Sequence, residues 1–179
     1  MTDLELLLDW LNDLSQDMRG EIEPLTPEAL YWQSHPEASS IGVTVWHVAR
    51  WMDVLKVRAF QDGPAEEEVW HTRGWRERTG YDPRGIGQRG FGAVTGYSAT
   101  NVAAIPQLPA NDLLTYLDET HTALRDYLAA LPPDALGQMA PGLGGKHTVY
   151  KLIKIEWQHF FGHLGEIQAL KAMWERQRR

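Results

Sequence analysis

The sequence predicts an all-α fold, a four-helix bundle, on the basis of three observations. Four long stretches repeat apolar side chains at the three- and four-residue spacing of an amphipathic helix. No stretch shows the strict apolar and polar alternation of a half-buried strand. The chain has 179 residues, enough to build one core, so we expect a single domain spanning residues 1–179.

The first predicted helix spans residues 3–19, and its apolar face is made of Leu4, Leu7, Leu8, Leu11, Leu14 and Met18. We expect Gly20 to end this helix, because glycine is common just after a last helical residue. Further on, Thr26 followed by Pro27 favours a helix of one or two turns.

The second long helix begins after a capping Ser39 or Ser40 and ends at residues 62–64. One apolar line contains Ile41, Val45, Val48, Met52, Leu55 and Ala59, and a second contains Val43, Thr44, Trp51 and Val54. His47 lies on the second line, about 100° around the helix from Val48. Because both lines must be buried, we expect the side chain of His47 to point into the bundle.

A long connection, residues 63–109, follows the second helix and holds half of the sixteen glycines. We expect a short helix within residues 66–78 and irregular structure over residues 81–93. A connection of this length either carries function or crosses the bundle to join two parallel helices.

The third helix is predicted from a cap at Asn111 or Asp112 to Leu131, and the fourth from a cap at Thr148 to about Arg176. The third helix has an apolar stripe, and two prolines at 132 and 133 follow it.

The composition excludes several classes of function. The chain has no cysteine, which rules out a disulfide framework, a thiolate-bound metal and a cysteine nucleophile. Its formal charge is −7, which argues against binding to nucleic acid. No apolar run approaches the roughly 18 residues of a membrane span, and the first residues are too acidic for a signal peptide. We therefore expect a cytoplasmic protein whose partner is a small molecule, neither a membrane nor a nucleic acid.

Two histidines four residues apart carry the main functional prediction. His159 and His163 lie one turn apart on the inward face of the fourth helix, as two ligands of one metal ion would. A third ligand must come from another helix, and His47 is the candidate. We predict that these three side chains bind one divalent metal ion. The ordinary alternative for each is a buried neutral histidine, and chance pairs at this spacing are common among seven histidines.

Two other metal sites fit parts of the sequence less well. Glu156 and His159 form the glutamate-x-x-histidine element of a two-metal ferritin-like site, which needs a second element on a core helix. A similar string, from Glu68 to His71, lies in the irregular connection, so one metal is favoured over two. A zincin peptidase needs glutamate directly after the first histidine, where Phe160 stands.

Other residues are candidates for supporting the metal or contacting a substrate. Glu156 lies where it would orient a histidine or act as a fourth ligand. His121 lies on an apolar line of the third helix, where a core role, a supporting role and a substrate contact all remain open. Residues 63–98 would form the mouth of the site. The candidate contacts to an anionic substrate there are Arg73, Arg76, Tyr81 and Arg84.

The chain resembles the DinB/YfiT-like superfamily over nearly its whole length. The similarity rests on the long connection and on these residues: Trp46, His47, Arg50 and Asp53 in the second helix, Val69, Trp70, Gly74 and Trp75 after it, and 163–167 (His-Leu-Gly-Glu-Ile) in the last helix. The resemblance implies an up-down-down-up four-helix bundle, with a long crossover between helices two and three. It also implies one divalent metal held by His47, His159 and His163, with Arg50, Asp53 and Glu166 as further candidates near the site.

The resemblance also has consequences for function. Relatives in this superfamily include enzymes that use low-molecular-weight thiols such as mycothiol or bacillithiol. Three imidazoles leave a zinc or nickel ion with open positions, where the pKa of a bound water or thiol falls toward neutrality. We expect a metal-dependent transferase that joins a thiol to a small electrophile. A metal-dependent hydrolase and a non-catalytic, stress-associated binding module remain alternatives, and a homodimer is expected for bundle surfaces of this type.

Overall fold

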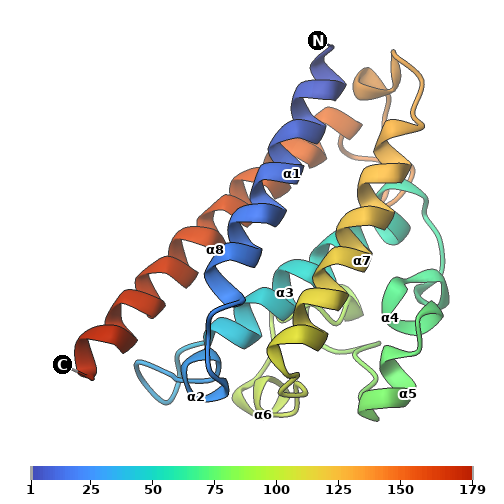
Figure 1. The fold of residues 1–179 in the computed structure, drawn as a ribbon. Helices are drawn as coiled ribbons and strands as arrows, with labels where there is room; N and C mark the ends of the chain where they lie inside the picture. The colour runs from blue at the N-terminus through green and yellow to red at the C-terminus, as the bar shows by residue number, and fades with distance from the viewer. Residues whose placement is uncertain (1, 179) are drawn as a thin grey trace.

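The computed structural model describes residues 2–178, and every regular element in that range is a helix (Figure 1). The all-α prediction is therefore confirmed. The four long helices are α1 (Asp3–Ile22), α3 (Ile41–Val54), α7 (Ala110–Ala129) and α8 (Val149–Gln177). None of the helices in the described range is both long and apolar enough to cross a membrane.

Helices α1 and α8 lie side by side and run in the same direction. Near their first turns, Trp157 donates a 3.0 Å hydrogen bond from Nε1 to the carbonyl of Leu7. About four turns later, Lys171 Nζ lies 2.7 Å from a carboxylate oxygen of Glu21. Figure 1 shows α3 and α7 running the opposite way, with the C-terminal half of α8 reaching past the other helices. Helices α3 and α7 can lie parallel to each other because a long connection joins them.

The second long helix does not stay α-helical to its end. Its last turns form a π-helix, η1 (Leu55–Phe60), so α3 itself stops at Val54. The backbone of Gly142 packs directly on this turn, where its N–H donates to the carbonyl of Ala59 at 3.0 Å. A Cβ at position 142 would lie 1.9 Å from the carbonyl oxygen of Arg58, so only glycine fits. The wider π-turn thus provides the carbonyl that ties the loop before α8 to α3.

Two predicted helix ends differ from the structure. Helix α1 continues through Gly20 to Ile22, and the side chain of Ile22 is fully buried. Burying isoleucine contributes about 1.5–3 kcal/mol, more than the ~1 kcal/mol that an interior glycine costs. Helix α7 begins at Ala110 after Pro109, with no side-chain cap from Asn111 or Asp112. The predicted caps Ser40 and Thr148 do accept from backbone N–H groups of α3 and α8.

The remaining elements are short. They are α2 (Pro27–Leu30), η2 (Ala65–Glu67), α4 (Val69–Thr72), α5 (Trp75–Thr79), η3 (Gln88–Gly90), α6 (Ala99–Ala103) and η4 (Ala135–Gly137). The predicted helix within residues 66–78 is therefore three separate turns. Residues 81–93, predicted to be irregular, are so except for the single turn η3. At Gly92 the backbone has φ +66°, and a Cβ would lie 2.3 Å from the carbonyl oxygen of Pro83. Glycine is required there.

An aromatic cluster holds this connection against the bundle. Trp46 of α3, Trp70, Trp75 and Tyr116 of α7 are buried, with Trp46 and Trp70 meeting edge to face at 5.7 Å. Trp70 stacks on Trp75 at 6.1 Å and meets Tyr116 edge-on at 5.0 Å. Each buried aromatic pair adds about 0.5–1.5 kcal/mol beyond the area it buries. The loop between α3 and α7 is therefore packed as part of the core.

Candidate metal centre

Three histidines from two helices meet on the inner side of α8. His159 and His163 lie one turn apart on α8, and their ring centroids are 4.5 Å apart. The ring of His47, from α3, lies 4.8 Å from that of His163 and 5.1 Å from that of His159. The Nε2 atom of His159 is 3.3 Å from Nε2 of His47 and 2.9 Å from Nε2 of His163. The structure thus brings together the three residues predicted as ligands.

The other ring nitrogen of each histidine faces an oxygen acceptor. Nδ1 of His47 lies 2.5 Å from the carbonyl oxygen of Ala93, which can only accept a hydrogen bond. Nδ1 of His163 lies 2.7 Å from a carboxylate oxygen of Glu166, and Nδ1 of His159 lies 3.4 Å from one of Glu156. With the protons on Nδ1, the three Nε2 atoms carry lone pairs that point toward one another.

Converging lone pairs repel unless a cation or a proton lies between them, so this arrangement fits a metal ion. In a tetrahedral zinc site with Zn–N distances of 2.0–2.1 Å, neighbouring nitrogens are about 3.3 Å apart. The two measured Nε2 separations, 3.3 and 2.9 Å, lie close to that value. Among the described residues, this trio is the one group of three or more histidine, aspartate or glutamate side chains placed to hold a metal.

The trio is protected from water on one side and open on the other. His47 is buried, and burial together with the neighbouring His163 and His159 lowers its pKa to about 3, which keeps the ring neutral. The side chain of His159 is 34% exposed and that of His163 is 22% exposed. A hollow of about 240 Å³ opens in front of them, and its other walls are Ser39, Val43, Thr44, Val94, Thr95 and Glu166. A small molecule can therefore reach the histidine side chains.

A buried arginine braces the loop that orients His47. Arg50, one turn after His47 on α3, is fully buried. Its Nε donates to the carbonyl of Gly92 and its Nη2 to the carbonyl of Phe91, both at 3.1 Å. The next carbonyl in the chain is that of Ala93, which accepts from His47. Three consecutive carbonyls are thus held by two side chains of α3.

Two carboxylates and a phenol complete this buried network. Arg50 lies 2.8 Å from Glu68 and 3.1 Å from Asp53, and the hydroxyl of Tyr116 donates to Asp53 at 3.2 Å. Asp53 also accepts from the backbone N–H groups that begin α4, at 2.7 and 2.9 Å. Burial raises the pKa of both Asp53 and Glu68, and the charge of Arg50 opposes that rise. Arg50 and Asp53 therefore act on the histidines through the loop, and neither contacts them.

The structure places the remaining candidates away from the histidines. The hydroxyl of Tyr81 lies 3.3 Å from that of Tyr97, further along the same loop. His121 lines a polar hollow between α1 and α7 together with Arg19 and Asp118, and burial lowers its pKa.

The three arginines of the connection are also directed elsewhere. Arg84 pairs with Asp82 and Glu66, and Arg76 pairs with Asp82. Arg73 is exposed. None of them lines the hollow in front of the histidines.

Sequence reasoning missed three groups that shape the centre: the Ala93 carbonyl, Tyr116 and Glu68. A backbone carbonyl in an irregular loop leaves no mark in the sequence, so nothing could have pointed to Ala93. Glu68 did carry a signal, as the first residue of a glutamate-x-x-histidine string. Its partner proved to be Arg50 and not a metal ion.

Comparisons with known proteins agree with this picture of the fold. A model of the DinB superfamily matches residues 10–167. A solved structure of a conserved protein from Enterococcus faecalis superposes with a TM-score of 0.77 over 96% of each chain, at 16% identity. At that identity the likeness concerns the fold alone. No curated protein matches the chain. The resemblance noted from the sequence is thereby confirmed, and the chain belongs to the DinB superfamily.

Proposed function

We propose that this protein is a metal-dependent enzyme in which His47, His159 and His163 hold one divalent ion, zinc or nickel. We further propose that it transfers a low-molecular-weight thiol to a small electrophile. The observation that carries the proposal is the convergence of three Nε2 atoms from two helices, while their Nδ1 atoms face oxygen acceptors. A structural histidine cluster would have no reason to aim three lone pairs at one point.

The surrounding helices support the same proposal. The parallel pair α1 and α8, with α3 and α7 running the other way, is the order that an up-down-down-up bundle requires. We take the four long helices to be that bundle. In such bundles, side chains from facing helices build metal sites in the core.

A divalent ion at this point would act as a Lewis acid and lower the pKa of an incoming thiol or water. The chain supplies orientation and a route for the proton. Ala93 and Glu166 hold the Nδ1 protons of His47 and His163, so the Nε2 atoms stay unprotonated. Glu166 also lines the hollow, so its carboxylate would accept the proton of an entering thiol.

The thiol must come from outside the chain, because the sequence has no cysteine. The hollow of about 240 Å³ has room for a thiol head and the reacting atom of an acceptor. The two substrates would then meet on the exposed side of His159.

Metal-dependent hydrolysis is the second candidate. The partial exposure of His159 and His163 favours it, since water reaches these side chains without any movement of the chain. In that case Glu166 would accept the proton of a water in place of that of a thiol.

Elemental analysis of untagged protein tests the metal. We expect about one divalent ion per chain, lost in His47→Ala and retained in His35→Ala, because His35 is an exposed histidine outside the site. Protein without metal under every loading condition would contradict the proposal. Incubation of the loaded protein with thiols and an aryl halide, followed by mass spectrometry of the products, separates the two enzymes. A thioether conjugate indicates the transferase, and hydrolysed acceptor alone indicates the hydrolase.

A further inference from the structure

A second, larger hollow lies beside the metal centre. Its volume is about 490 Å³, and it is bounded by the segment before α3, the first turn of α3 and helix α6. Ser39 and Val43 form walls of both hollows. Thr95 lines the smaller hollow and Tyr97, two residues later, lines the larger one. A ligand reaching the histidines therefore has adjoining space for the rest of its body, which we call the side chamber.

The described residues that line the side chamber offer polar groups but no positive charge. Gln33 and Gln107 provide side-chain amides, Tyr31 and Tyr97 provide hydroxyls, and the rest of its wall is mostly small apolar side chains. Gln33 donates one bond to the carbonyl of Ala38, which leaves its amide oxygen for a ligand. Tyr31 donates to the carbonyl of Leu108, which leaves its hydroxyl oxygen as an acceptor.

The charged groups around the two hollows are carboxylates. Glu37 lines the side chamber and Glu166 lines the hollow at the histidines. Within residues 2–178, no lysine or arginine lines either one. A ligand whose reacting end lies at the histidines would place an anionic body near Glu37, where no lysine or arginine of the described residues lines the chamber to pair with it.

We infer that the side chamber binds the body of the substrate, and that this body is uncharged and carries hydroxyl or amide groups. The inference rests on the proposed function, because it takes the histidines as the reacting end. The sequence led us to expect an anionic substrate held by Arg73, Arg76 or Arg84. The side chamber instead favours a substrate without negative charge.

The test uses two ligands that differ in one charge, N-acetylcysteine and N-acetylcysteine amide, titrated into the full chain. Nitrogen-15 NMR follows the side-chain amide signals of Gln33 and Gln107, which report on the chamber whether or not a metal is bound. We expect N-acetylcysteine amide to bind at least fivefold tighter than N-acetylcysteine. Glu37→Gln should narrow that ratio, and Glu77→Gln, at an exposed position of α5, should leave it unchanged. Equal binding, tighter binding of the acid, or unmoved signals would overturn the inference.

A second experiment fills the side chamber with a large side chain. Ala103 is an exposed residue of α6 that lines the chamber, so Ala103→Trp should fill it without disturbing the core. We expect this variant to weaken N-acetylcysteine amide at least tenfold and to leave 2-mercaptoethanol, which fits the smaller hollow, unchanged. Unchanged binding of the amide would count against the chamber. In cobalt-loaded protein, a thiolate-to-cobalt absorption band shows separately whether the sulfur of the ligand binds the metal. A missing band would contradict the proposed function. Binding in the side chamber would still be decided by the NMR titration.

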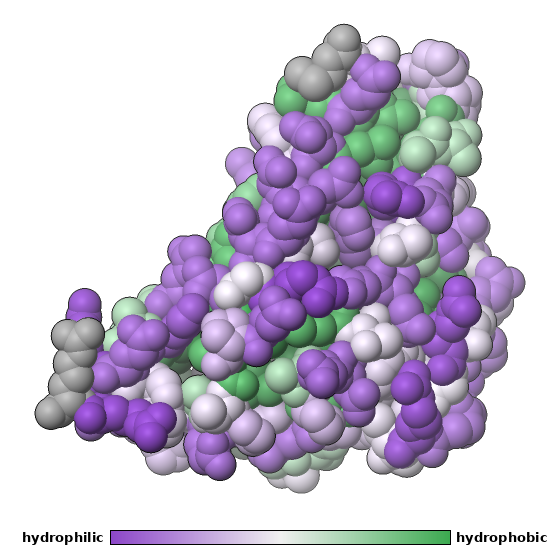
Figure 2. Space-filling model, viewed as in Figure 1, coloured by the Kyte–Doolittle hydropathy of each residue, from purple (hydrophilic) through white to green (hydrophobic). Residues whose placement is uncertain are grey.

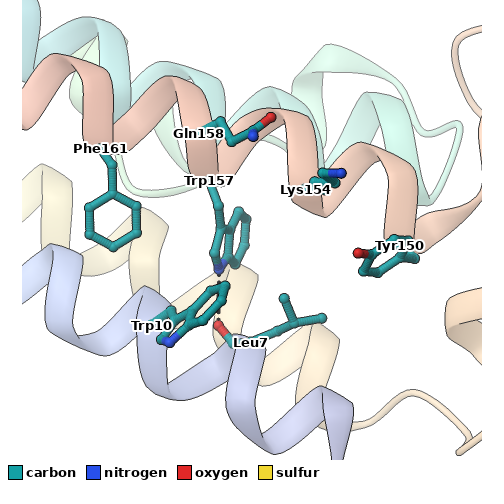
Figure 3. A pocket seen from close by; sticks show the side chains of 7 residues that line it. All are labelled: Leu7, Trp10, Tyr150, Lys154, Trp157, Gln158 and Phe161. Atoms are coloured by element: carbon teal, nitrogen blue, oxygen red, sulfur yellow. Dashed lines mark hydrogen bonds between the residues drawn. The ribbon is translucent and has the colours of Figure 1, made fainter.

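An apolar groove lies between α1 and α8 (Figure 3). It shares no lining residue with the side chamber. Its volume is about 630 Å³, and an adjoining hollow of about 550 Å³ shares Leu7, Trp10 and Tyr150 with it. Trp10 is 47% exposed, Tyr150 48% and Phe161 39%. Figure 2 shows hydrophobic residues gathered near the start of α1 on a surface that is otherwise mostly hydrophilic. Large aromatic side chains exposed together in this way are typical of interaction surfaces.

The charges beside the groove are arranged in a self-complementary way. On the α1 side, Asp3, Asp13 and Asp17 are exposed on the same face as Trp10. On the α8 side, Lys151 and Lys154 are exposed, and Lys154 itself lines the groove. A two-fold rotation about the groove places the acidic edge of one copy against the basic edge of the other.

Helix α8 also carries a glycine on this surface that the chain itself does not require. Gly165 lies one turn after Phe161, and a Cβ there would meet no atom within 4 Å. Glycine inside a helix is destabilising relative to alanine, but it permits close approach of another backbone. We propose that the groove is the interface of a homodimer, in which a second copy of the chain covers Trp10 and Phe161.

Sedimentation velocity over a range of concentrations tests this proposal. We expect a dimer for the full chain, a monomer for Trp10→Glu and for Phe161→Glu, and an unchanged dimer for Met139→Glu, since Met139 is also exposed but lies outside the groove. Lys154→Glu should weaken dimerisation at least fivefold through charge alone. A monomeric chain at the highest concentration measured, or dimers in the two groove variants, would rule the interface out.

Discussion

Nδ1 of His47 lies 2.5 Å from the carbonyl oxygen of Ala93, 46 residues further along the chain. This bond sets which nitrogen of His47 faces the other two histidines. Because Ala93 belongs to an irregular loop, the orientation of a residue in the core depends on how well that loop is held. The loop is held by Arg50 and by the backbone geometry around Gly92.

Gly92→Ala should therefore damage the metal centre without touching a histidine. The new Cβ would lie 2.3 Å from the carbonyl oxygen of Pro83, so residues 91–93 must shift and the bond from His47 to Ala93 is lost. We expect a loss of about 1–3 kcal/mol in the free energy of unfolding and a roughly tenfold or greater loss of metal affinity. Urea unfolding and competition with a chelator measure the two quantities.

Gly80→Ala is the matched control. Gly80 also has a positive φ, +68°, but a Cβ there would meet nothing within 4 Å. It should cost about 1 kcal/mol of backbone strain and leave metal affinity unchanged. Equal losses of affinity in both variants would show that loop strain in general, and not the Ala93 contact, weakens the site.

Arg50→Met should destabilise the fold strongly. The variant keeps a long apolar side chain but leaves Asp53 and Glu68 buried without their cation, a change that typically costs about 3–5 kcal/mol. Arg76→Met, which breaks an exposed pair with Asp82, should change the free energy of unfolding by less than about 1 kcal/mol. Urea unfolding compares the two variants. A similarly small change in the free energy of unfolding of both would mean that the buried network around Arg50 does not stabilise the fold.

The parts of this structure that sequence could predict are those with local causes. The periodicity of α8 and its cap Thr148 place His159 and His163 one above the other, because helix geometry alone decides that relation. The inward direction of His47 follows from the two apolar lines of α3. The meeting of the three rings depends on how α3 packs against α8. The sequence was compatible with this packing but did not determine it.

The parts that sequence could not predict depend on distant contacts. Gly20 lies inside α1 because Ile22, two residues later, finds a fully buried position. The direction of Arg50 depends on carbonyls 41 and 42 residues away, which no periodicity in α3 reveals. The same holds for the side chamber, whose walls come from two segments far apart in the sequence, residues 31–43 and 97–107.

Glu166→Gln should weaken metal binding moderately. The carboxylate of Glu166 accepts from Nδ1 of His163 at 2.7 Å and fixes the orientation of that ring, and a neutral amide oxygen would accept the same bond more weakly. We expect a loss of about tenfold in metal affinity, with a larger loss in Glu166→Ala. Glu175→Gln, an exposed change near the end of α8, is the control. Chelator competition measures all three, and equal affinity in Glu166→Ala and the unaltered protein would exclude this supporting role.

The metal-free protein should lose stability as the pH falls below about 6.5. The pKa of His47 in the folded chain is lowered to about 3, because burial withholds water from the charged ring and the neighbouring histidines repel it. Between these two values the unfolded chain binds a proton that the folded chain does not, so the free energy of unfolding decreases with decreasing pH. At pH 5 the loss from this residue is ~2 kcal/mol.

Replacement of His47 by glutamine separates this effect from the titration of carboxylates. The glutamine amide can still donate to Ala93 but takes up no proton, so the free energy of unfolding of His47→Gln should fall less between pH 7 and pH 5 than that of the unaltered chain. His35→Gln, at an exposed histidine, should keep the original pH dependence. Urea unfolding in the presence of a chelator at the two pH values provides the comparison. Parallel losses in all three proteins would mean that the His47 ring is protonated as readily in the folded chain as in the unfolded one, and the site would then lack the dry inner wall that holds its Nε2 lone pair free for a cation.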